Sequence, residues 1–442
     1  MKRVLLIITF ALVTFVVAAC GSGGKETLVI WVGEEVEDFY QDKMDEYVEN
    51  YNSTNSEEFP YNVDVRAADT GTAAGVFLQD IEAGPDILTV AHDNLGRLIS
   101  GSSAIRPIQD DALLSQIEAQ NTESFLDAIK ANFEGTTYTF GVPYEAQALI
   151  LYYNKAYLDA EDVQTWEGIW DVAKAEDKQA TTVTGQDGFN NSFLTLASFV
   201  DTGEKIVRLY EDGVVENTEF VNDGSVSVMQ WGQRFYSDDN GAKEATDSGW
   251  QVDFSNEDTI SLVGGAWHFK AAQAAIGDDL GVAVLPQFTI TDEDAYGDVD
   301  AGTVMQSGTF TDTKMFVMNR TSDKTDYLED ILLYLTDKDI QEESFVDYGT
   351  LPAYKNALEE FEGMDDDSLN TELAIAQLAM FEYGIPQPFG KEARFNVYYY
   401  QRQAPELLYE MLRNSDGEFD STTDIIERME AIERIWLGIR DE

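Results

Sequence analysis

The side chains that most often carry chemistry are either scarce or very abundant in this 442-residue chain. It contains two histidines, His92 and His268, and one cysteine, Cys20, against 83 aspartates and glutamates. So few histidines and thiols argue against a metal site, and we expect no metal and no cofactor. Glycoside hydrolysis would need two neighbouring carboxylates, one protonated and one ionised. Because almost one residue in five is acidic, such pairs occur by chance, and no pair indicates an active site.

Motifs of nucleophilic and phosphate chemistry are also missing. The sequence has no G-x-S-x-G nucleophile elbow and no G-x-x-x-x-G-K-[ST] phosphate loop. Its formal net charge of −55 repels nucleic acids and anionic lipid headgroups, so we expect neither as a partner. The acids are spread along the chain, which is typical of a protein adapted to salt, where screening removes the self-repulsion.

Residues 1–20 have the layout of a secretory signal that ends at the only cysteine. A positively charged start precedes an uninterrupted run of apolar or small residues, Val4–Ala19, which is shorter than a membrane span. The Val-Ala-Ala-Cys junction resembles a bacterial lipoprotein box. The resemblance implies a lipidated Cys20, a flexible tether over residues 21–26, and a location on the extracellular face of the cell membrane. An ordinary signal peptide with an incidental cysteine is the alternative.

The remaining roughly 420 residues are too many for a single core, so we expect two domains. Apolar runs predict strands at 28–32, 61–65 and 85–91, with helices over 37–51 and 73–83 between them. This β-α-β-α-β order implies a parallel sheet with helices on both faces, which binds ligands at the carboxyl ends of its strands. Further strands are expected at 141–144 and 148–153, and helices at 322–345, 366–383 and 398–440.

Several segments carry a more specific pattern in a fixed order. They are Leu28–Glu35 (LVIWVGEE), Asp86–Asn94 (DILTVAHDN), Gly141–Lys155 (GVPYEAQALILYYNK), Thr165–Ile169 (TWEGI), Gly264–Trp267 (GGAW) and Gly281–Pro286 (GVAVLP). Together they resemble the maltose/maltodextrin-binding proteins, the solute-binding subunits of sugar ABC importers. Leu351–Tyr354 and Ile385–Pro388 extend the resemblance more loosely.

The resemblance implies an α/β fold of two lobes, the type II fold of periplasmic binding proteins. Each lobe should be a mostly parallel sheet flanked by helices, and the chain should cross the hinge more than once. We expect one lobe over 27–146 and 299–347 and the other over 147–298 and 348–442. Closure of the lobes would let both contact one ligand in the cleft and exclude water.

A sugar offers hydroxyls and one flatter apolar face, so its site needs charged groups and aromatic rings. By the resemblance, Asp93, followed by Asn94, accepts sugar hydroxyls, with an ordinary loop acid as the alternative. Glu34 and Glu35 end the first strand, where the family has an acidic contact, and one of them should face the cleft. The basic residue that usually stands beside that acid is missing from this sequence.

The hinge segment supplies further candidates. Gln147 aligns with a hydroxyl-binding glutamate of the family, and Glu145 lies two residues earlier. Either side chain can hydrogen-bond a sugar, while ordinary hinge packing is the alternative for both. Tyr144, at the expected strand end, can stack on the ligand or donate its hydroxyl.

Aromatic candidates come from the second half of the chain. Trp267 occupies the position of a stacking tryptophan of the family, and a core tryptophan is the alternative. Phe395 ranks first near the position of a second tryptophan, which is missing, with Arg394 and Tyr398–Tyr400 nearby. A third tryptophan position holds Val90. These differences count against maltose in particular and not against sugars in general.

The sequence therefore predicts a lipid-anchored, monomeric receptor that delivers a sugar to the permease of an ABC importer and catalyses no reaction. The expected ligand is maltose or a maltodextrin, and another di- or oligosaccharide is the alternative within this class. From a different class, the alternative is a surface lipoprotein enzyme that acts on glycans. A third hypothesis is an adhesive acidic lipoprotein without a small-molecule ligand.

Overall fold

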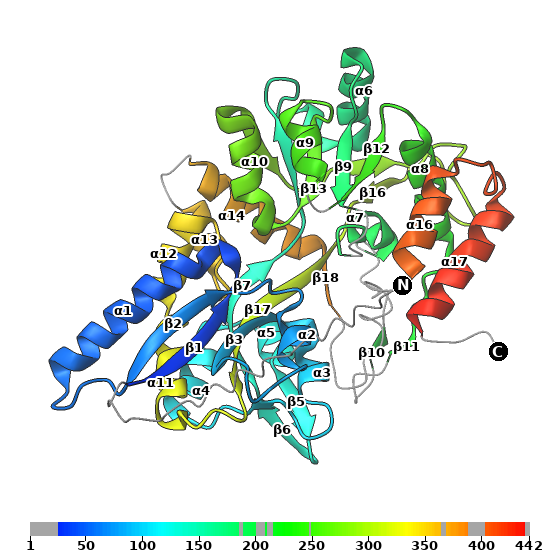
Figure 1. The fold of residues 1–442 in the computed structure, drawn as a ribbon. Helices are drawn as coiled ribbons and strands as arrows, with labels where there is room; N and C mark the ends of the chain where they lie inside the picture. Colours follow the sequence, from blue (N-terminus) through cyan, green and yellow to red (C-terminus); the bar gives the residue numbers. More distant parts are fainter. Residues whose placement is uncertain are drawn as a thin grey trace, which may run out of the picture.

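The structure is a computed structural model that describes residues 25–184, 189–199, 208–209, 215–246, 249–363, 368–387 and 403–437. Figure 1 shows two α/β bodies, here called the first and the second lobe, with β7 and β17 at their junction. The blue strands β1 and β2 lie in the first lobe, and the red helices near the C-terminus lie in the second. This architecture agrees with the predicted two-lobed α/β fold. The predicted residues Cys20 and Phe395 lie outside the described residues.

The first lobe is built around a seven-stranded sheet with the path β18–β17–β3–β1–β2, in which β4 and β7 also pair with β17. Its strands are β1 (Glu26–Val32), β2 (Tyr61–Ala67), β3 (Ile87–Ala91), β4 (Ile105–Arg106), β7 (Gly141–Gln147), β17 (Thr309–Asn319) and β18 (Gly384–Pro386). β1 is parallel to β2 and β3, as predicted. β17 is antiparallel to β3, β4 and β7, so the sheet is mixed rather than mostly parallel.

The antiparallel pairs arise where the chain passes between the lobes. After β7, only Ala148 and Leu149 precede β8 (Ile150–Asn154), a strand of the second sheet. On β17, Phe310 belongs to the core of the second lobe and Phe316 to the core of the first. β7 therefore leads out of the first lobe and β17 leads into it, which gives the two strands opposite directions.

The second lobe contains a five-stranded sheet in the order β12–β9–β13–β8–β14. Besides β8, its strands are β9 (Thr181–Thr184), β12 (Ala242–Ala245), β13 (Ser261–Gly264) and β14 (Leu280–Ala283). β9 is parallel to β12 and β13, and β8 is antiparallel to β13 and β14. Three further pairs are β5 (Lys130–Phe133) with β6 (Thr136–Thr139), β10 (Arg208–Leu209) with β11 (Val215–Asn217), and β15 (Gln287–Thr289) with β16 (Val304–Gln306).

Helices surround both sheets. They are α1 (Glu37–Thr54), α2 (Ala73–Phe77), α3 (Leu95–Leu98), α4 (Asp111–Gln120), α5 (Glu123–Ala128), α6 (Trp166–Glu176), α7 (Ser192–Thr195), α8 (Asp223–Ser237), α9 (Gly249–Ser255), α10 (Phe269–Ile276), α11 (Thr325–Leu335), α12 (Lys338–Tyr348), α13 (Ala357–Glu362), α14 (Leu369–Met380), α16 (Gln403–Arg413) and α17 (Thr422–Trp436). Three of the short 3-10 helices are η1 (Glu34–Val36), η2 (His92–Asn94) and η5 (Ala266–His268). None of the helices in the described part of the chain is long and apolar enough to cross a membrane.

The helix predictions hold for α1, α14, α16 and α17, but two others need correction. The helix expected over 73–83 ends at Phe77, because the chain then turns and the Asp80 side chain accepts the backbone N–H of Ala83. The helix expected over 322–345 is two helices, α11 and α12. They separate at Asp337, whose side chain caps α12 by accepting the backbone N–H of Asp339.

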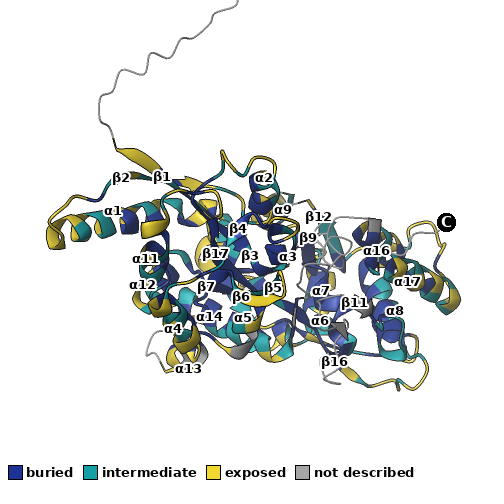
Figure 2. Ribbon diagram, turned by 90° about the horizontal axis from the view of Figure 1, so that it is seen from below, coloured by how far each residue is buried: buried dark blue, intermediate teal, exposed yellow. Residues whose placement is uncertain are grey.

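Each lobe has its own hydrophobic core, as Figure 2 shows by the buried residues around each sheet. In the first lobe, Phe39, Tyr40 and Met44 of α1 pack onto the sheet, which is the face that the sequence pattern predicts. A third, smaller cluster joins Ala146 of β7 to Leu351 and Phe361. The crossing strand β7 is thus packed along its length, and every residue in it is buried.

Candidate functional site

The carboxyl ends of β1 and β3 meet the crossing strands β7 and β17 at one place in the first lobe. Five charged or titratable side chains gather there and form what we call the polar cluster: Glu35, His92, Glu145, Asp312 and Lys314. Strand register brings them together, because Lys314 lies opposite both Glu145 on β7 and Ala91 at the end of β3. Asp312 lies opposite Gln147 in the same register.

Lys314 is the centre of the polar cluster. Its Nζ lies 3.0 Å from Glu145 Oε1 and 3.2 Å from Glu35 Oε1. The side chains of Lys314 and Glu145 are 4% and 2% exposed, whereas that of Glu35 is 35% exposed. Burial opposes the charge of Lys314, but Glu145 and Glu35 outweigh it and raise the pKa of the ammonium above its usual value. The nearby ammonium in turn lowers the pKa of Glu35, while burial raises the pKa of Glu145.

His92 forms the second ion pair of the polar cluster. Its Nδ1 contacts Asp312 Oδ1, and its Nε2 lies 3.3 Å from the backbone oxygen of Gln387, just beyond β18. Burial alone would lower the pKa of the imidazole, but Asp312 raises it above the usual value. The histidine thus ties the end of β3 to β17 and to the chain after β18, which is a structural role.

The remaining predicted residues of the first lobe occupy different places. Asp93 is half-buried in η2, and Asn94 donates its Nδ2 to Asp93 Oδ1 at 2.7 Å. The side chain of Glu34 is exposed, whereas the carboxylate of Glu35 accepts a hydrogen bond from Lys314. The ring of Tyr144 is buried in the core of the first lobe.

The structure therefore brings part of the predicted hinge set together. Gln147 donates its Nε2 to Glu145 Oε1 at 3.2 Å, so these two residues adjoin Glu35 through Lys314. Tyr144 is 4% exposed and packs with its ring centroid 4.6 Å from that of Phe316, on the core side of the sheet.

In the second lobe, aromatic side chains follow the end of β13. We call Phe189, Trp250, Trp267 and His268 the aromatic cluster. The Trp267 ring centroid lies 5.7 Å from that of Phe189 and 5.5 Å from that of His268. His268 also packs at 4.8 Å against Trp250. Burial lowers the pKa of His268 to about 3, so this histidine is neutral over most of the pH range.

Two glycines make room for these rings. A Cβ on Gly265 would lie 2.1 Å from the indole of Trp267, and a Cβ on Gly264 would lie 2.1 Å from Nδ1 of His268. Tyr152 on β8 donates its hydroxyl to the Gly265 carbonyl at 2.8 Å and holds this backbone in place. Trp267 itself is partly buried rather than fully enclosed.

Sequence reasoning missed four residues of these clusters, which are Asp312, Lys314, Phe189 and Trp250. Asp312 and Lys314 are two residues apart on β17, so they share one face of an almost fully buried strand. Two opposite charges at that spacing inside a buried strand are a signal that the sequence contains. Phe189 gave no such signal, because it lies in a loop segment outside every matched motif.

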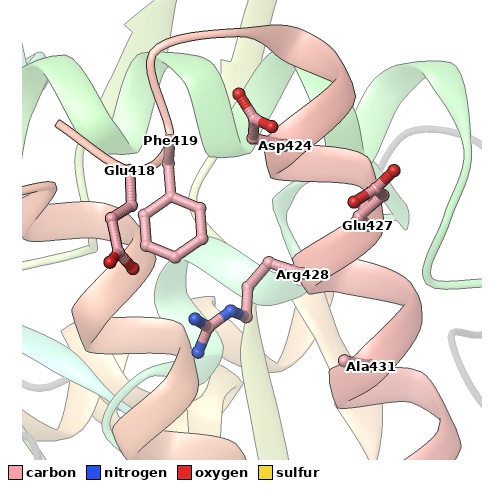
Figure 3. A pocket seen from close by; sticks show the side chains of 6 residues that line it. All are labelled: Glu418, Phe419, Asp424, Glu427, Arg428 and Ala431. Atoms are coloured by element: carbon pink, nitrogen blue, oxygen red, sulfur yellow. The ribbon is translucent and has the colours of Figure 1, made fainter.

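Two other features lie away from the clusters. Figure 3 shows a hollow of about 450 Å³ on α17 and the loop before it, where the Arg428 guanidinium lies 4.6 Å from the Phe419 ring centroid. No predicted site residue lines this hollow. Within the described ranges, no three His, Cys, Asp or Glu side chains are grouped in a way that would hold a metal ion.

The structure has two α/β lobes that are joined by crossing strands. The first lobe carries the polar cluster at its strand ends and the second carries the aromatic cluster. This arrangement is that of a two-lobed solute-binding protein. Comparison with known families agrees with this class. The chain belongs to the bacterial extracellular solute-binding proteins, whose family model matches residues 46–371. No curated protein sequence matches the chain.

Solved structures share the fold over nearly the whole chain. The unliganded maltodextrin-binding protein MalE1 from L. casei BL23 is 17% identical, with 94% of this chain and 99% of that chain covered and a TM-score of 0.68. A cyclo/maltodextrin-binding protein with maltotetraose is 18% identical (93% and 98% covered, TM-score 0.65). The GacH receptor of Streptomyces glaucescens, solved without ligand and with acarbose, is 16% identical (95% and 100% covered, TM-score 0.69).

Proposed function

We propose that this solute-binding protein is a lipid-anchored receptor that captures a sugar and delivers it to the permease of an ABC importer. Maltose or a maltodextrin is the first candidate ligand, and another di- or oligosaccharide is the second. The similar structures support a sugar, since two of those proteins were solved in complex with maltotetraose and acarbose. The lipoprotein box at Cys20 supports an anchor at the extracellular face of the membrane. We propose that the receptor acts there as a monomer.

The observation that carries this proposal is the difference between the two clusters. Charged groups at strand ends of the first lobe suit sugar hydroxyls, because hydrogen bonds to ionised groups are the stronger ones. Ring faces at a strand end of the second lobe suit the apolar face of a sugar. A ligand between the lobes would meet both kinds of surface at once.

Within this proposal, Asp93, Asn94 and Glu35 of the first lobe and Trp267 of the second contact the ligand. The buried Glu145 and Gln147 lie behind Glu35. Phe395 remains a proposed contact. Tyr144, in the core, acts as support for the strand that carries Glu145. The exposed Glu34 contributes charge near the site.

We further propose that the lobes are discontinuous, with boundaries near residues 146, 298 and 347. The first boundary falls where β7 leads out of the first sheet. The second precedes β16 and β17, and Met305 and Phe310 beyond it still pack in the core of the second lobe. The third follows α12, ahead of the chain that leads to α14 and β18.

A thermal-shift screen followed by calorimetry tests the function. The chain from residue 21 onward is mixed with maltose, maltotriose, maltotetraose and a panel of unrelated saccharides. A ligand at about 100 times its dissociation constant should stabilise the protein by roughly 2.7 kcal/mol, which gives a visible shift. Trp267→Ala should remove the shift, whereas Tyr138→Ala, an exposed aromatic residue on the β5–β6 hairpin, should leave it unchanged.

The outcomes separate the hypotheses. Binding of another saccharide keeps the receptor and changes its ligand. Release of smaller sugars from a bound glycan, detected by chromatography, overturns the receptor in favour of an enzyme. The absence of any shift across the panel overturns the sugar. Cys20→Ser in the full chain should move the protein from the membrane fraction to the soluble fraction.

A further inference from the structure

The basic residue that the sequence lacks beside Glu35 has a counterpart in space. Lys314 lies 279 positions later in the chain, yet its Nζ is 3.2 Å from Glu35 Oε1. The carboxylate reaches it by folding back over Gly33, where a Cβ would lie 2.7 Å from Glu35 Oε1. The absence of a side chain at Gly33 therefore permits the contact.

Lys314, Glu35 and Glu145 have more hydrogen-bond donors and acceptors than they use among themselves. A lysine ammonium has three N–H donors, and Glu35 and Glu145 account for two of them. Glu145 Oε1 also accepts from Gln147, whereas its Oε2 is buried and has no partner within the described part of the chain. One ammonium thus faces two carboxylates, and the group keeps an excess of negative charge and of acceptors.

Exposure shows which part of the group a ligand can reach. Lys314 and Glu145 are almost fully enclosed, and Glu35 is the partner with a substantial exposed surface. A ligand that approaches the first lobe therefore meets the Glu35 carboxylate first. The direction of that carboxylate depends on the enclosed ammonium behind it.

We propose that Lys314 is the positioning residue of the ligand site, which holds the Glu35 carboxylate toward the space between the lobes so that Glu35 accepts a sugar hydroxyl. This inference rests on the proposed function. It also assigns a role to β17, because the strand that links the lobes carries the residue that aims a contact of the first lobe.

A role in positioning makes two predictions that a purely structural role does not. First, the contribution of Glu35 to affinity should depend on Lys314. Second, the ammonium lowers the pKa of Glu35, so its removal should raise that pKa. Binding that needs the ionised carboxylate is lost as the pH falls through the pKa of Glu35. Without Lys314, this loss should therefore occur at a higher pH.

The test uses a double variant, since Lys314→Met alone leaves Glu145 buried without a counter-ion and risks unfolding. Lys314→Met/Glu145→Gln removes both charges together. Calorimetry measures the affinity of the full chain for the best saccharide of the screen, with and without Glu35→Gln. We expect Glu35→Gln to weaken binding about tenfold or more in the wild-type background and less than about twofold in the double variant.

The matched control is Lys324→Met/Asp86→Asn. This pair is also a lysine and an acid at low exposure, 3.1 Å apart. Asp86 directly precedes β3, so the pair lies at the end of this strand opposite to Ala91 and Lys314. We expect it to keep the wild-type affinity and the wild-type acid limb of the pH profile.

The results distinguish failure of the positioning role of Lys314 from failure of the proposed sugar-receptor function. If Glu35→Gln weakens binding equally in both backgrounds, or if the acid limb does not move, Lys314 does not position Glu35 and the inference is overturned while the sugar receptor stands. If the wild-type chain binds no saccharide, the proposed function and this inference fail together.

Discussion

The polar cluster and the aromatic cluster lie at corresponding places, the strand ends of the two lobes, but are assembled differently. The polar cluster joins residues of β7 and β17 to residues that follow β1 and β3, so Glu35 meets a lysine 279 positions away. In the aromatic cluster, Trp267 and His268 are neighbours in one turn after Gly264 and Gly265, and Phe189 and Trp250 join them from two other segments. The charged surface thus depends on the crossing strands, and the ring surface depends on one turn and the segments that pack against it.

The two histidines of the chain also differ between the clusters, in the direction of their pKa shifts. His92 in the polar cluster faces Asp312, which raises its pKa. His268 in the aromatic cluster lies between two indole rings, and burial lowers its pKa to about 3. One lobe therefore stabilises charge at its strand ends, while the other excludes it. A sugar, with hydroxyls on its edge and C–H groups on its face, is a ligand that uses both surfaces.

The largest effect should come from breaking the polar cluster at its centre. Lys314→Met leaves Glu145 buried without its counter-ion, and removal of one partner of a buried pair costs about 3–5 kcal/mol. We expect the free energy of unfolding, measured by chemical denaturation, to fall by that amount. Adding Glu145→Gln should recover most of the loss. Equal stabilities of Lys314→Met and the wild type would show that the pair is not enclosed.

The aromatic cluster should respond in affinity rather than in stability. Gly265→Ala places a Cβ about where the Trp267 indole lies, so the ring must move. If the ring stacks on the ligand, affinity should fall by about 2 kcal/mol, or roughly 30-fold, as for Trp267→Ala. Calorimetry measures this loss. Gly75→Ala in α2, whose nearest neighbouring atom lies 3.6 Å away, is the matched control and should bind as the wild type does.

The histidines should give opposite pH dependences of stability. Below about pH 6.5 the unfolded chain protonates His268 and the folded chain does not, so the free energy of unfolding falls toward pH 3 by about 1.4 kcal/mol per pH unit. His92 has a raised pKa, so its contribution is complete below about pH 6.5 and is lost as the pH rises through the folded pKa.

NMR of the two imidazole Hε1 signals separates these titrations, because the chain has no other histidine. His268→Phe should flatten the acid slope, and His92→Gln should flatten the slope above neutral pH. Two ordinary titrations near pH 6.5 would contradict the difference between the clusters.

Local sequence patterns predicted the strands and helices well where the buried residues recur at the spacing of one strand or one helix. Leu28–Val32 is a buried strand, Glu37–Tyr51 lies within α1, and the parallel pairs of β1 follow from their order. The mixed sheets did not follow from that order. They depend on the direction in which β7 and β17 cross between the lobes, and no local propensity encodes that direction.

The site was predictable to the extent that it is local. Trp267 and the glycines before it form one motif, and the structure places them at a strand end as expected. Lys314 could not be predicted from the residues beside Glu35, because it lies 279 positions later in the chain. A lysine on another strand supplies the charge, and only the register of β17 with β3 and β7 reveals it.

The smallest effect should come from Phe189, which packs against Trp267 from a segment distant in the sequence. Its ring meets Trp267 at 66° with centroids 5.7 Å apart, an edge-to-face pair worth about 0.5–1.5 kcal/mol. Phe189→Leu keeps the apolar volume but removes the ring edge that orients the indole. We therefore expect a several-fold loss of affinity by calorimetry. The control Phe288→Leu breaks the stacked pair with Trp231 inside the same lobe and should lower stability without changing affinity. Unchanged affinity in Phe189→Leu would mean that Gly265 and the turn after β13 orient Trp267 without the Phe189 ring.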